Sequence, residues 1–351
     1  MKDSFYEQGS IIYSGIGSCY LGGVIGDKRA GEAIITNTRS NAILVSGTGT
    51  GSVYVGGFTG RMYRPNLFEC YATSDVHAYG SNNIVSAGGF ICILTIYDDG
   101  EVSLISKCFA TGNVFATGNN VITAGGLLGR IVNINNQNTG KVSIKNSYAF
   151  GNVLVDRSSS GGSSTFAGGL VGNISDTESS TLPGRHYEIN YCYARGEITV
   201  KSNGTGPVYA GGIIGYMNIT DDNNSGSIKN NASLSKSITA MGSGNLYIGR
   251  IYGEVTNRVP AANRASNYAV DTMFLGTANV YSNNPYQVFT PVSIINNAGD
   301  KDGQSLFTRQ FTSSLSAWTD STLLNFGSQT GVWNFSIVSR GYPTLNGLGG
   351  Q

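Results

Sequence analysis

The sequence predicts an all-β protein folded as a right-handed parallel β-helix, a solenoid of about seven coils with a C-terminal cap. Three observations support this fold class. Two short words recur in alternation along most of the chain, the residues within them alternate as in β-strands, and no stretch of the repeat region has the apolar period of an amphipathic helix. The handedness follows from the general preference of parallel crossover connections.

The composition agrees with a turn-rich β protein and excludes several classes. The chain has 351 residues, including 50 glycines, 20 tyrosines and 7 prolines, and 12% of its residues are charged. It has too many aromatics and too little charge for a disordered chain, and it lacks the three-residue period of collagen. A formal net charge of +1 offers no basic surface, so we expect no nucleic-acid partner. No apolar run approaches the roughly 18 residues that span a bilayer, so we expect no membrane insertion.

The first word has the form GGxxG. Its copies begin at residues 22, 56, 125, 168 and 211, with a truncated copy, GGFIC, at 88–92 and a diverged copy, IGRIYG, at 248–253. A glycine held in a strand gives up roughly 0.5–1 kcal/mol relative to alanine, so the geometry must require it. We expect the glycines to form a sharp corner and the aliphatics, including Val24, Leu127, Val171 and Ile214, to form an inward-facing ladder.

The second word lies between copies of the first. Its copies are CYATSDV (70–76), CFATGNV (108–114), SYAFGNV (147–153), CYARGEI (192–198) and a weaker ASLSKSI (232–238). In CFATGNV, residues 108, 110, 112 and 114 share one face of a strand. Segments such as VSIKN (142–146) add a further strand to each unit. We therefore predict three short strands per coil, each paired with the same strand in the coils above and below.

Cysteines recur at one position of the second word. Cys70, Cys108 and Cys192 occupy it, and Ser147 fills it in the copy between. The chain has 5 cysteines, so at least one cannot pair within it. We interpret them as small buried side chains in a ladder, with a disulfide framework as the alternative, and the redox compartment stays open.

The next position of the second word is aromatic. Tyr71, Phe109, Tyr148 and Tyr193 form this ladder, which we expect to serve packing. The alternative is an outward-facing platform on which sugars stack. Asn113 and Asn152, further along the same word, are expected to stabilise turns rather than to bind a ligand.

The paired words, of the type AGGLVG and CYATGNV, resemble the GLUG repeat of large secreted or surface-attached bacterial proteins, including stalk regions of some streptococcal immunoglobulin A proteases. The resemblance covers roughly residues 20–270 in six or seven copies. Its late copies are similar too, with IGRIYG followed by SNYAV (266–270), and the closing VWNFSIVSRGYPTL (332–345) is similar to the ending of such proteins. The resemblance implies a bacterial protein that is extracellular or attached to the cell surface.

The resemblance does not extend to protease chemistry. The family's proteases carry an HExxH zinc site in a separate domain, whereas this chain has only His77 and His186, neither followed by glutamate. We therefore assign no catalytic, cofactor-binding or metal-binding residue, and we expect no cofactor.

The extent of the repeat words divides the chain into three parts. Residues 1–19 start or cap the solenoid, residues 20–270 form the repeats, and residues 271–351, which hold Trp318 and Trp333, form a C-terminal capping segment. A small binding domain is the alternative for the last part. The start, MKDSFYEQGS, lacks the blocks of a secretory signal, so we expect any targeting segment to have been removed.

Other activities known for β-helices find little support. The acidic pairs Asp98–Asp99 and Asp221–Asp222 lie in non-adjacent units and are interpreted as solvated turn residues. GGVIGD (22–27) has the wrong spacing for a calcium nonapeptide, and GSGN (242–245) has no plausible histidine partner for serine chemistry. An ice-binding threonine row is broken after two copies, because Phe150 and Arg195 follow Thr73 and Thr111.

These observations favour a non-enzymatic extracellular surface protein, an adhesin or stalk module. Its expected partner is a host or environmental glycan or surface protein, and its oligomeric state is left open. We expect recognition at the insertions RSSSGGSS (157–164) and SDTESSTLPGRH (175–186), because loops can vary on a rigid scaffold. The alternatives are a polysaccharide-cleaving β-helix enzyme and a purely structural spacer.

Overall fold

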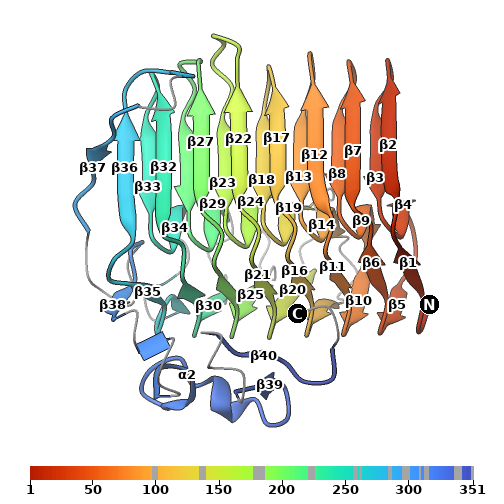
Figure 1. Cartoon of the computed structure of the whole chain (residues 1–351), viewed down its shortest axis with the longest axis vertical. Coiled ribbons are helices and arrows are strands. Elements are labelled where there is room, and N and C mark those ends of the chain that lie inside the picture. Colours follow the sequence, from red (N-terminus) through yellow and green to blue (C-terminus); the bar gives the residue numbers. More distant parts are fainter. Residues whose placement is uncertain are drawn as a thin grey trace.

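The computed structural model is a parallel β-helix, in which equivalent strands of successive coils lie side by side along the molecule (Figure 1). It describes residues 1–96, 102–133, 140–176, 186–219, 226–255, 260, 263–283, 287–294, 301–307, 310–311, 316–335 and 342–348. The predicted all-β class and the solenoid are confirmed. Within these residues the helical elements are short, such as α2 (Ser316–Thr319) and the 3-10 helix η2 (Phe326–Ser328).

Each coil passes through five parallel sheets, which we name A to E in chain order, rather than through the three strands predicted. Sheet A contains β5 (Ala33–Thr36), β10 (Pro65–Phe68), β15 (Val102–Ser106), β20 (Lys141–Lys145), β25 (His186–Asn190) and β30 (Ser227–Lys229). Sheet B contains β1 (Phe5–Glu7), β6 (Arg39–Asn41), β11 (Tyr71–Ala72), β16 (Phe109–Ala110), β21 (Tyr148–Ala149), β26 (Tyr193–Ala194), β31 (Ala232–Ser233), β35 (Tyr268–Val270) and β38 (Gln304–Leu306).

Sheet C contains β2 (Ser10–Gly15), β7 (Leu44–Gly49), β12 (Asp75–Gly80), β17 (Val114–Gly118), β22 (Val153–Arg157), β27 (Ile198–Ser202), β32 (Ser237–Gly242) and β36 (Phe274–Ala278), with β37 (Thr290–Pro291) antiparallel at its end. Sheet D contains β3 (Cys19–Gly22), β8 (Val53–Gly56), β13 (Val85–Gly88), β18 (Ile122–Gly125), β23 (Thr165–Gly168), β28 (Val208–Gly211) and β33 (Leu246–Gly249). Sheet E contains β4 (Ile25–Lys28), β9 (Thr59–Tyr63), β14 (Ile91–Ile96), β19 (Leu128–Asn133), β24 (Val171–Asp176), β29 (Ile214–Asn218) and β34 (Tyr252–Val255). Sheets D and E have seven strands each, which confirms about seven coils.

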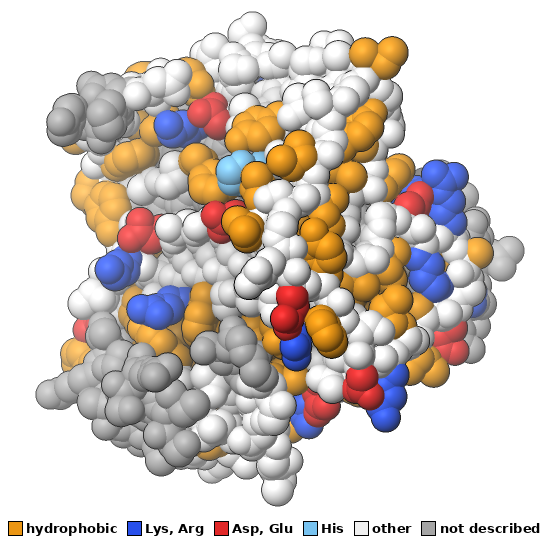
Figure 2. All heavy atoms as spheres, turned by 45° about the vertical axis from the view of Figure 1, so that its right-hand side comes forward, with side chains coloured by type: hydrophobic (Ala, Val, Ile, Leu, Met, Phe, Trp, Pro, Cys, Tyr) orange, Lys and Arg blue, Asp and Glu red, His pale blue; other side chains and the backbone are white. Residues whose placement is uncertain are grey.

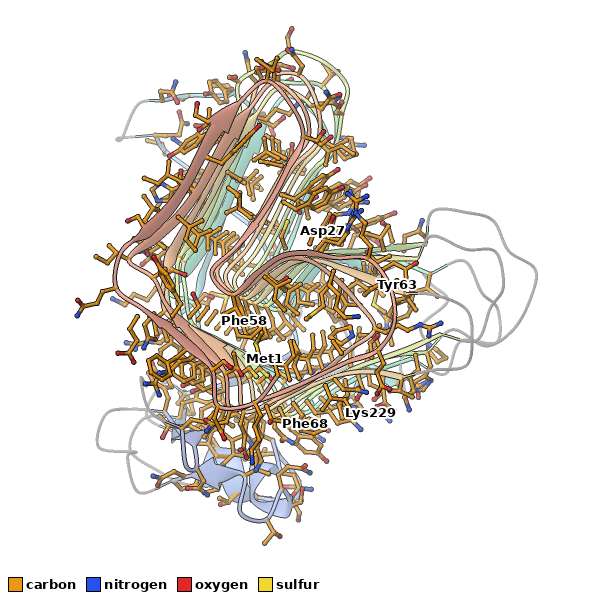
Figure 3. All side chains as sticks on the ribbon, turned by 90° about the vertical axis from the view of Figure 1, so that its right-hand side faces the viewer. Met1, Asp27, Phe58, Tyr63, Phe68 and Lys229 are labelled. Carbon is orange, nitrogen blue, oxygen red and sulfur yellow. The ribbon has the colours of Figure 1, made fainter. Side chains whose placement is uncertain are left out.

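The GGxxG word forms the corner between sheets D and E. In the central coil, β18 ends at Gly125 and β19 begins at Leu128, so the second glycine and the first aliphatic make the turn. A Cβ atom on Gly126 would lie 2.1 Å from the carbonyl oxygen of Gly169 in the next coil. The glycines therefore allow close approach between coils at an inward bend (Figure 3).

Both aliphatics of the word are buried, in two ladders rather than one. Leu127 belongs to the ladder of Phe58, Phe90, Leu170 and Ile213, all fully buried at the corner. Val171 and Ile214 belong to the other ladder, which begins sheet E. Val24 is half-buried, because its coil has a neighbour on one side only.

The corner between sheets A and B depends on a left-handed residue. Equivalent positions just before each sheet B strand have positive φ, between 46° and 57°, at Asn37, Glu69, Lys107, Asn146, Tyr191, Asn230 and Ser266. The second word then covers a short sheet B strand, a corner and the start of sheet C, as in β16 and β17. In the fifth copy Ala232 pairs with Tyr193, so this word begins at Asn231, one residue before the predicted start.

The aromatic ladder of sheet B serves packing. Tyr71, Phe109, Tyr148 and Tyr193 stack with centroid separations of 4.5, 4.9 and 5.0 Å. They point outward from the coil, but the ladder is covered, and the last three rings are fully buried. The sequence alternative of an exposed sugar-stacking platform is therefore excluded for this ladder.

The cover is the side segment, by which we mean the described residues between 310 and 348. It contains α2, η2 and the antiparallel pair β39 (Trp333–Asn334) and β40 (Thr344–Leu345), and it lies along the side of the solenoid (Figure 1). Trp318 and Trp333 lie 5.3 and 5.8 Å from the ring of Tyr193, whose hydroxyl donates to the carbonyl of Pro343.

The last coil has its own covering contacts. β37 pairs with β36, and the carbonyl oxygen of Lys301 accepts the backbone N–H groups of Ile251 and Tyr252. Solenoid strands also extend beyond residues 20–270, from β1 at Phe5 to β38 at Leu306. These outer coils pair without complete copies of either word.

All five cysteines are free and buried, and Cys70, Cys108 and Cys192 are thus the small buried side chains that the ladder interpretation predicts. Burial raises the pKa of the Cys192 thiol to about 12. Two later ladder positions hold buried asparagines, Asn231 and Asn267, whose amides donate to the carbonyls of Ile189 and Ile228.

Candidate functional site

A broad shelf lies at the carboxyl end of sheet C, over the first four coils. Its volume is about 580 Å³. The outward-facing Ser14, Thr48, Tyr79 and Thr117 occupy one register position in β2, β7, β12 and β17. The described residues that line the shelf are Ser14, Gly15, Ile16, Thr48, Gly49, Thr50, Tyr79, Gly80, Ser81, Thr117, Gly118, Asn119 and Ser158.

Glycines at the next register position let the chain turn tightly under the shelf. Gly49, Gly80 and Gly118 pair with one another across β7, β12 and β17. A Cβ atom on Gly80 would lie 2.5 Å from a methyl carbon of Val85 in sheet D. The connections that follow, 50–52, 81–84 and 119–121, are accordingly short.

The fifth coil replaces this glycine with Arg157 and ends the shelf. Arg157 pairs with Gly118 and is followed by the longer connection 158–164, which projects beyond its neighbours (Figure 1). We call residues 157–164 the wall loop. Ser158 of this loop lines the shelf, so one of the two predicted recognition segments borders a concave surface.

Arg157 holds the wall loop from inside. Its side chain is fully buried, and its Nη1 and Nη2 donate to the carbonyls of Ser163 and Gly161, each at 2.6 Å. On the outside, the hydroxyls of Ser158 and Ser163 donate to the side chains of Asn119 and Asn120, each at 2.8 Å. These bonds fix the loop against the turn of the preceding coil.

Among the residues that the structure describes, the lining of the shelf carries hydroxyl, amide and apolar groups and no charged side chain. Tyr79 is 38% exposed, and its hydroxyl lies 3.2 Å from Nδ1 of His77. Burial lowers the pKa of His77, and the ring packs edge-on against Phe115 at 4.7 Å. The imidazole is therefore neutral near pH 7.

The two histidines lie apart, in different sheets. His77 is in β12 of sheet C, and His186 is in β25 of sheet A, where its Nε2 lies 2.9 Å from Oε1 of Glu188. Among the residues that the structure describes, no three histidine, cysteine or acidic side chains gather in a way that could hold a metal ion.

Glu188 is the centre of a charged cluster on the outer face of sheet A. Its carboxylate contacts Lys141 at 3.1 Å, Lys145 at 3.0 Å and the hydroxyl of Ser143 at 2.9 Å. Burial alone would raise the pKa of Glu188, but hydrogen bonds from Lys145, His186, Lys141 and Ser143 lower it from 4.5 to about 2.

We expect this cluster to make the stability of the folded protein depend on pH in the acidic range. A carboxylate whose pKa is lowered by folding contributes stability that is present above pH 4.5 and is lost as the pH falls towards 2. Urea midpoints at pH 7, 4 and 3 should fall less steeply for Glu188→Gln than for the unmodified protein. Glu69→Gln, which removes a single ion pair with Lys107 at 3.0 Å, is the matched control and should retain the steep profile.

The remaining predicted residues have varied outcomes. Asp98–Asp99, Asp221–Asp222 and most of the insertion 175–186 lie outside the described residues. Asn113 and Asn152 accept hydrogen bonds from the backbone of the next coil, so both stabilise turns as expected.

The two residues that interrupt the threonine row take part in a second cleft. Phe150 and Arg195 line it with Tyr342 of the side segment, and the Arg195 guanidinium lies 4.6 Å from the Tyr342 ring centre. Glu197 is the single acidic residue in the lining of this cleft as described, and the shelf lining has none, so neither cavity holds a pair of carboxylates.

Charges on the visible face of the molecule are mixed. Figure 2 shows lysine and arginine side chains interspersed with aspartate and glutamate, and no large area of one sign. Among the described residues no helix is both long and apolar enough to span a membrane.

The comparisons with known proteins give one similar structure. The chain is similar to the crystal structure of a protein from Bacteroides ovatus described as a putative immunoglobulin A1 protease, with 18% sequence identity and a TM-score of 0.49, over 86% of this chain and 77% of that chain. No family model and no curated protein sequence matches the chain.

Proposed function

We propose that the protein is a non-enzymatic module of the bacterial surface or extracellular space that binds a neutral glycan on the shelf of sheet C. The observation that carries this proposal is the uncharged, partly apolar shelf bounded by the wall loop. Concave surfaces with a few fixed polar groups on an apolar background are typical of ligand sites.

The lining suits the chemistry of a neutral sugar. The hydroxyls of Thr48 and Thr117 can donate and accept hydrogen bonds without a charge. Because Ser158 already donates to Oδ1 of Asn119, its hydroxyl oxygen remains as an acceptor and the Asn119 amide NH2 as a donor. The exposed ring of Tyr79 and the side chain of Ile16, which is 88% exposed, offer apolar contact to the C–H faces of a sugar ring. A charged polymer would find no counter-charge here.

The wall loop supports the proposal because its conformation is already fixed by hydrogen bonds. Because Arg157 and the two serine–asparagine bonds already fix the loop, binding requires little further ordering of the protein. The extracellular, bacterial setting rests on the resemblance of the two words to the GLUG repeat. The same scaffold would serve as a stalk if it carries no ligand, which is the second candidate function.

A glycan-binding screen on the intact chain tests the proposal. Neutral and acidic oligosaccharides would be immobilised, and hits would be titrated by calorimetry. We expect a neutral oligosaccharide to bind and Tyr79→Ala to weaken it by about tenfold, which corresponds to about 1.4 kcal/mol. Replacing residues 158–163 by a short turn should abolish binding.

Phe274→Ala is the matched control. Phe274 lies on the same sheet, is also 38% exposed and is remote from the shelf lining, so its removal should leave binding unchanged. A blank across the neutral panel would favour the spacer, whereas cleavage of any oligosaccharide would favour the polysaccharide-cleaving alternative. Binding that survives both changes at the shelf would show that the site lies elsewhere.

A further inference from the structure

A second concave surface runs along the bend between sheets D and E. Outward-facing residues of sheet D occupy one register, Tyr20, Tyr54, Ser86, Thr123, Phe166, Tyr209 and Tyr247. Outward-facing residues of sheet E occupy another, Asp27, Arg61, Ile93, Arg130, Asn173, Tyr216 and Glu254. We call the surface between these rows the corner groove, and Asp27 marks it in Figure 3.

Aromatic side chains divide the corner groove into two stacks with a gap. Tyr20 and Tyr54 stack at 4.7 Å, and Tyr209 stacks with Phe166 at 5.1 Å and with Tyr247 at 4.9 Å. Ser86 and Thr123 separate the stacks, which places Tyr54 about 14 Å from Phe166 at the spacing of neighbouring strands. The gap therefore has an aromatic ring at either end, and the two small hydroxyl residues between these rings are fully buried.

Two arginines on the sheet E side differ in their partners. Arg61 is held by Asp27 at 2.7 Å and lies 4.1 Å above the ring of Tyr20. Arg130 lies nearer the gap, and within the described residues it forms no ion pair and its buried Nε has no hydrogen-bond partner. A charged guanidinium in a partly buried position is costly unless a counter-charge reaches it.

Other polar atoms near Arg130 share this condition. The hydroxyls of Ser86 and Thr123 and the amide oxygen of Asn173 are buried without a partner in the described structure. A cavity of about 180 Å³ opens beside Arg130, lined by Tyr20, Tyr54, Arg61, Ile93, Thr95, Arg130 and Val132. Its volume matches a single ring-sized ligand group rather than a folded partner.

We propose that the corner groove binds a carboxylate-bearing sugar residue, with its carboxylate paired to Arg130 and its ring beside Tyr54. The guanidinium matches a carboxylate through two parallel hydrogen bonds. The hydroxyls of Tyr20, Tyr54 and Thr95 in the lining match sugar hydroxyls, and the site is separate from the neutral shelf on sheet C. The ligand is therefore an acidic glycan, and this inference does not depend on the proposed function of the shelf.

Calorimetry with a uronic-acid oligosaccharide, its carboxyl-reduced counterpart and sodium acetate tests the proposal on the full chain. We expect the acidic oligosaccharide to bind at least tenfold more tightly than the reduced one, and acetate to bind weakly. Arg130→Met should remove this preference. Arg29→Met, which removes a cation that is 74% exposed, should retain it.

Tyr54→Leu keeps the test decisive if Arg130→Met does not fold, because it leaves the cation in place and removes a ring that lines the cavity. This variant should lower the affinity for the acidic oligosaccharide about threefold to tenfold. Tyr79→Ala on the shelf should leave acidic binding unchanged, so failure of one site is distinguishable from failure of the other. Equal affinity for the acidic and reduced oligosaccharides, or a preference that persists in Arg130→Met, would overturn the proposal.

Discussion

Gly126→Ala is expected to destabilise the solenoid by about 3–5 kcal/mol, in the range reserved for severe core substitutions. The added Cβ would meet the carbonyl oxygen of Gly169 at 2.1 Å and the Cβ of Ala149 at 2.9 Å. Neither neighbour can move freely, because the backbone N–H of Gly126 also donates to the carbonyl of Gly168 in the adjacent coil. Relief of the overlap would separate the coils and break that ladder.

Denaturant unfolding followed by circular dichroism measures this effect. Gly162→Ala in the wall loop is the matched control, because its Cβ would meet only the hydroxyl of Thr205, at 3.9 Å. We expect the control to change stability by less than about 0.5 kcal/mol. An unchanged midpoint for Gly126→Ala would refute the role of this glycine in the approach of the coils.

Trp318→Ala is expected to release the side segment from sheet B. The indole is fully buried, lies near Tyr193, Phe311 and Phe326, and donates from Nε1 to the carbonyl of Phe311 at 2.9 Å. Removing a buried tryptophan typically costs about 3–5 kcal/mol. Because this indole joins the segment to the solenoid, we expect the loss to fall on that contact and to leave the coils paired.

Hydrogen exchange measured by mass spectrometry distinguishes local release of the side segment from unfolding of the coils. Exchange should rise in the side segment and in the strands β21 and β26, while sheets D and E keep their protection, and a dye for apolar surface should bind. Phe307→Ala, which removes a ring that is 56% exposed, is the control and should change neither signal. Uniform loss of protection along all coils would contradict a locally attached segment.

The repeat words predict the coils because they mark corners. Corner geometry restricts residue choice, as the overlap at Gly126 illustrates, so the words recur and can be aligned. The same fact explains the wrong strand count. Copies of the second word span a corner and belong to two strands, for example Phe109–Ala110 and Val114–Gly118 for CFATGNV. Because the alternation of inward and outward residues continues across the corner, the sequence pattern predicts one strand where the structure has two.

The candidate sites were harder to predict because their residues face outward and vary. The sequence indicates the wall loop by its length, but not the shelf beside it, since threonines and serines without a fixed spacing carry no signal of concavity. The corner groove does leave a trace. The residue two positions before the first glycine of the word is aromatic at Tyr20, Tyr54, Phe166 and Tyr209, and at Tyr247 before Gly249 of the diverged copy, and the exceptions, Ser86 and Thr123, mark the gap.

The attachment of the side segment has a consequence for the order of assembly. Hydrogen bonds between coils join residues about one coil apart, whereas the bond from Tyr193 to Pro343 spans 150 residues. Because synthesis proceeds from the N-terminus, the middle coils can pair long before Trp318 and Trp333 have been synthesised. Until then the ladder around Tyr148 and Tyr193 faces solvent, a period in which nascent chains are prone to associate. The ladder therefore becomes buried only after the chain has been synthesised past Trp333.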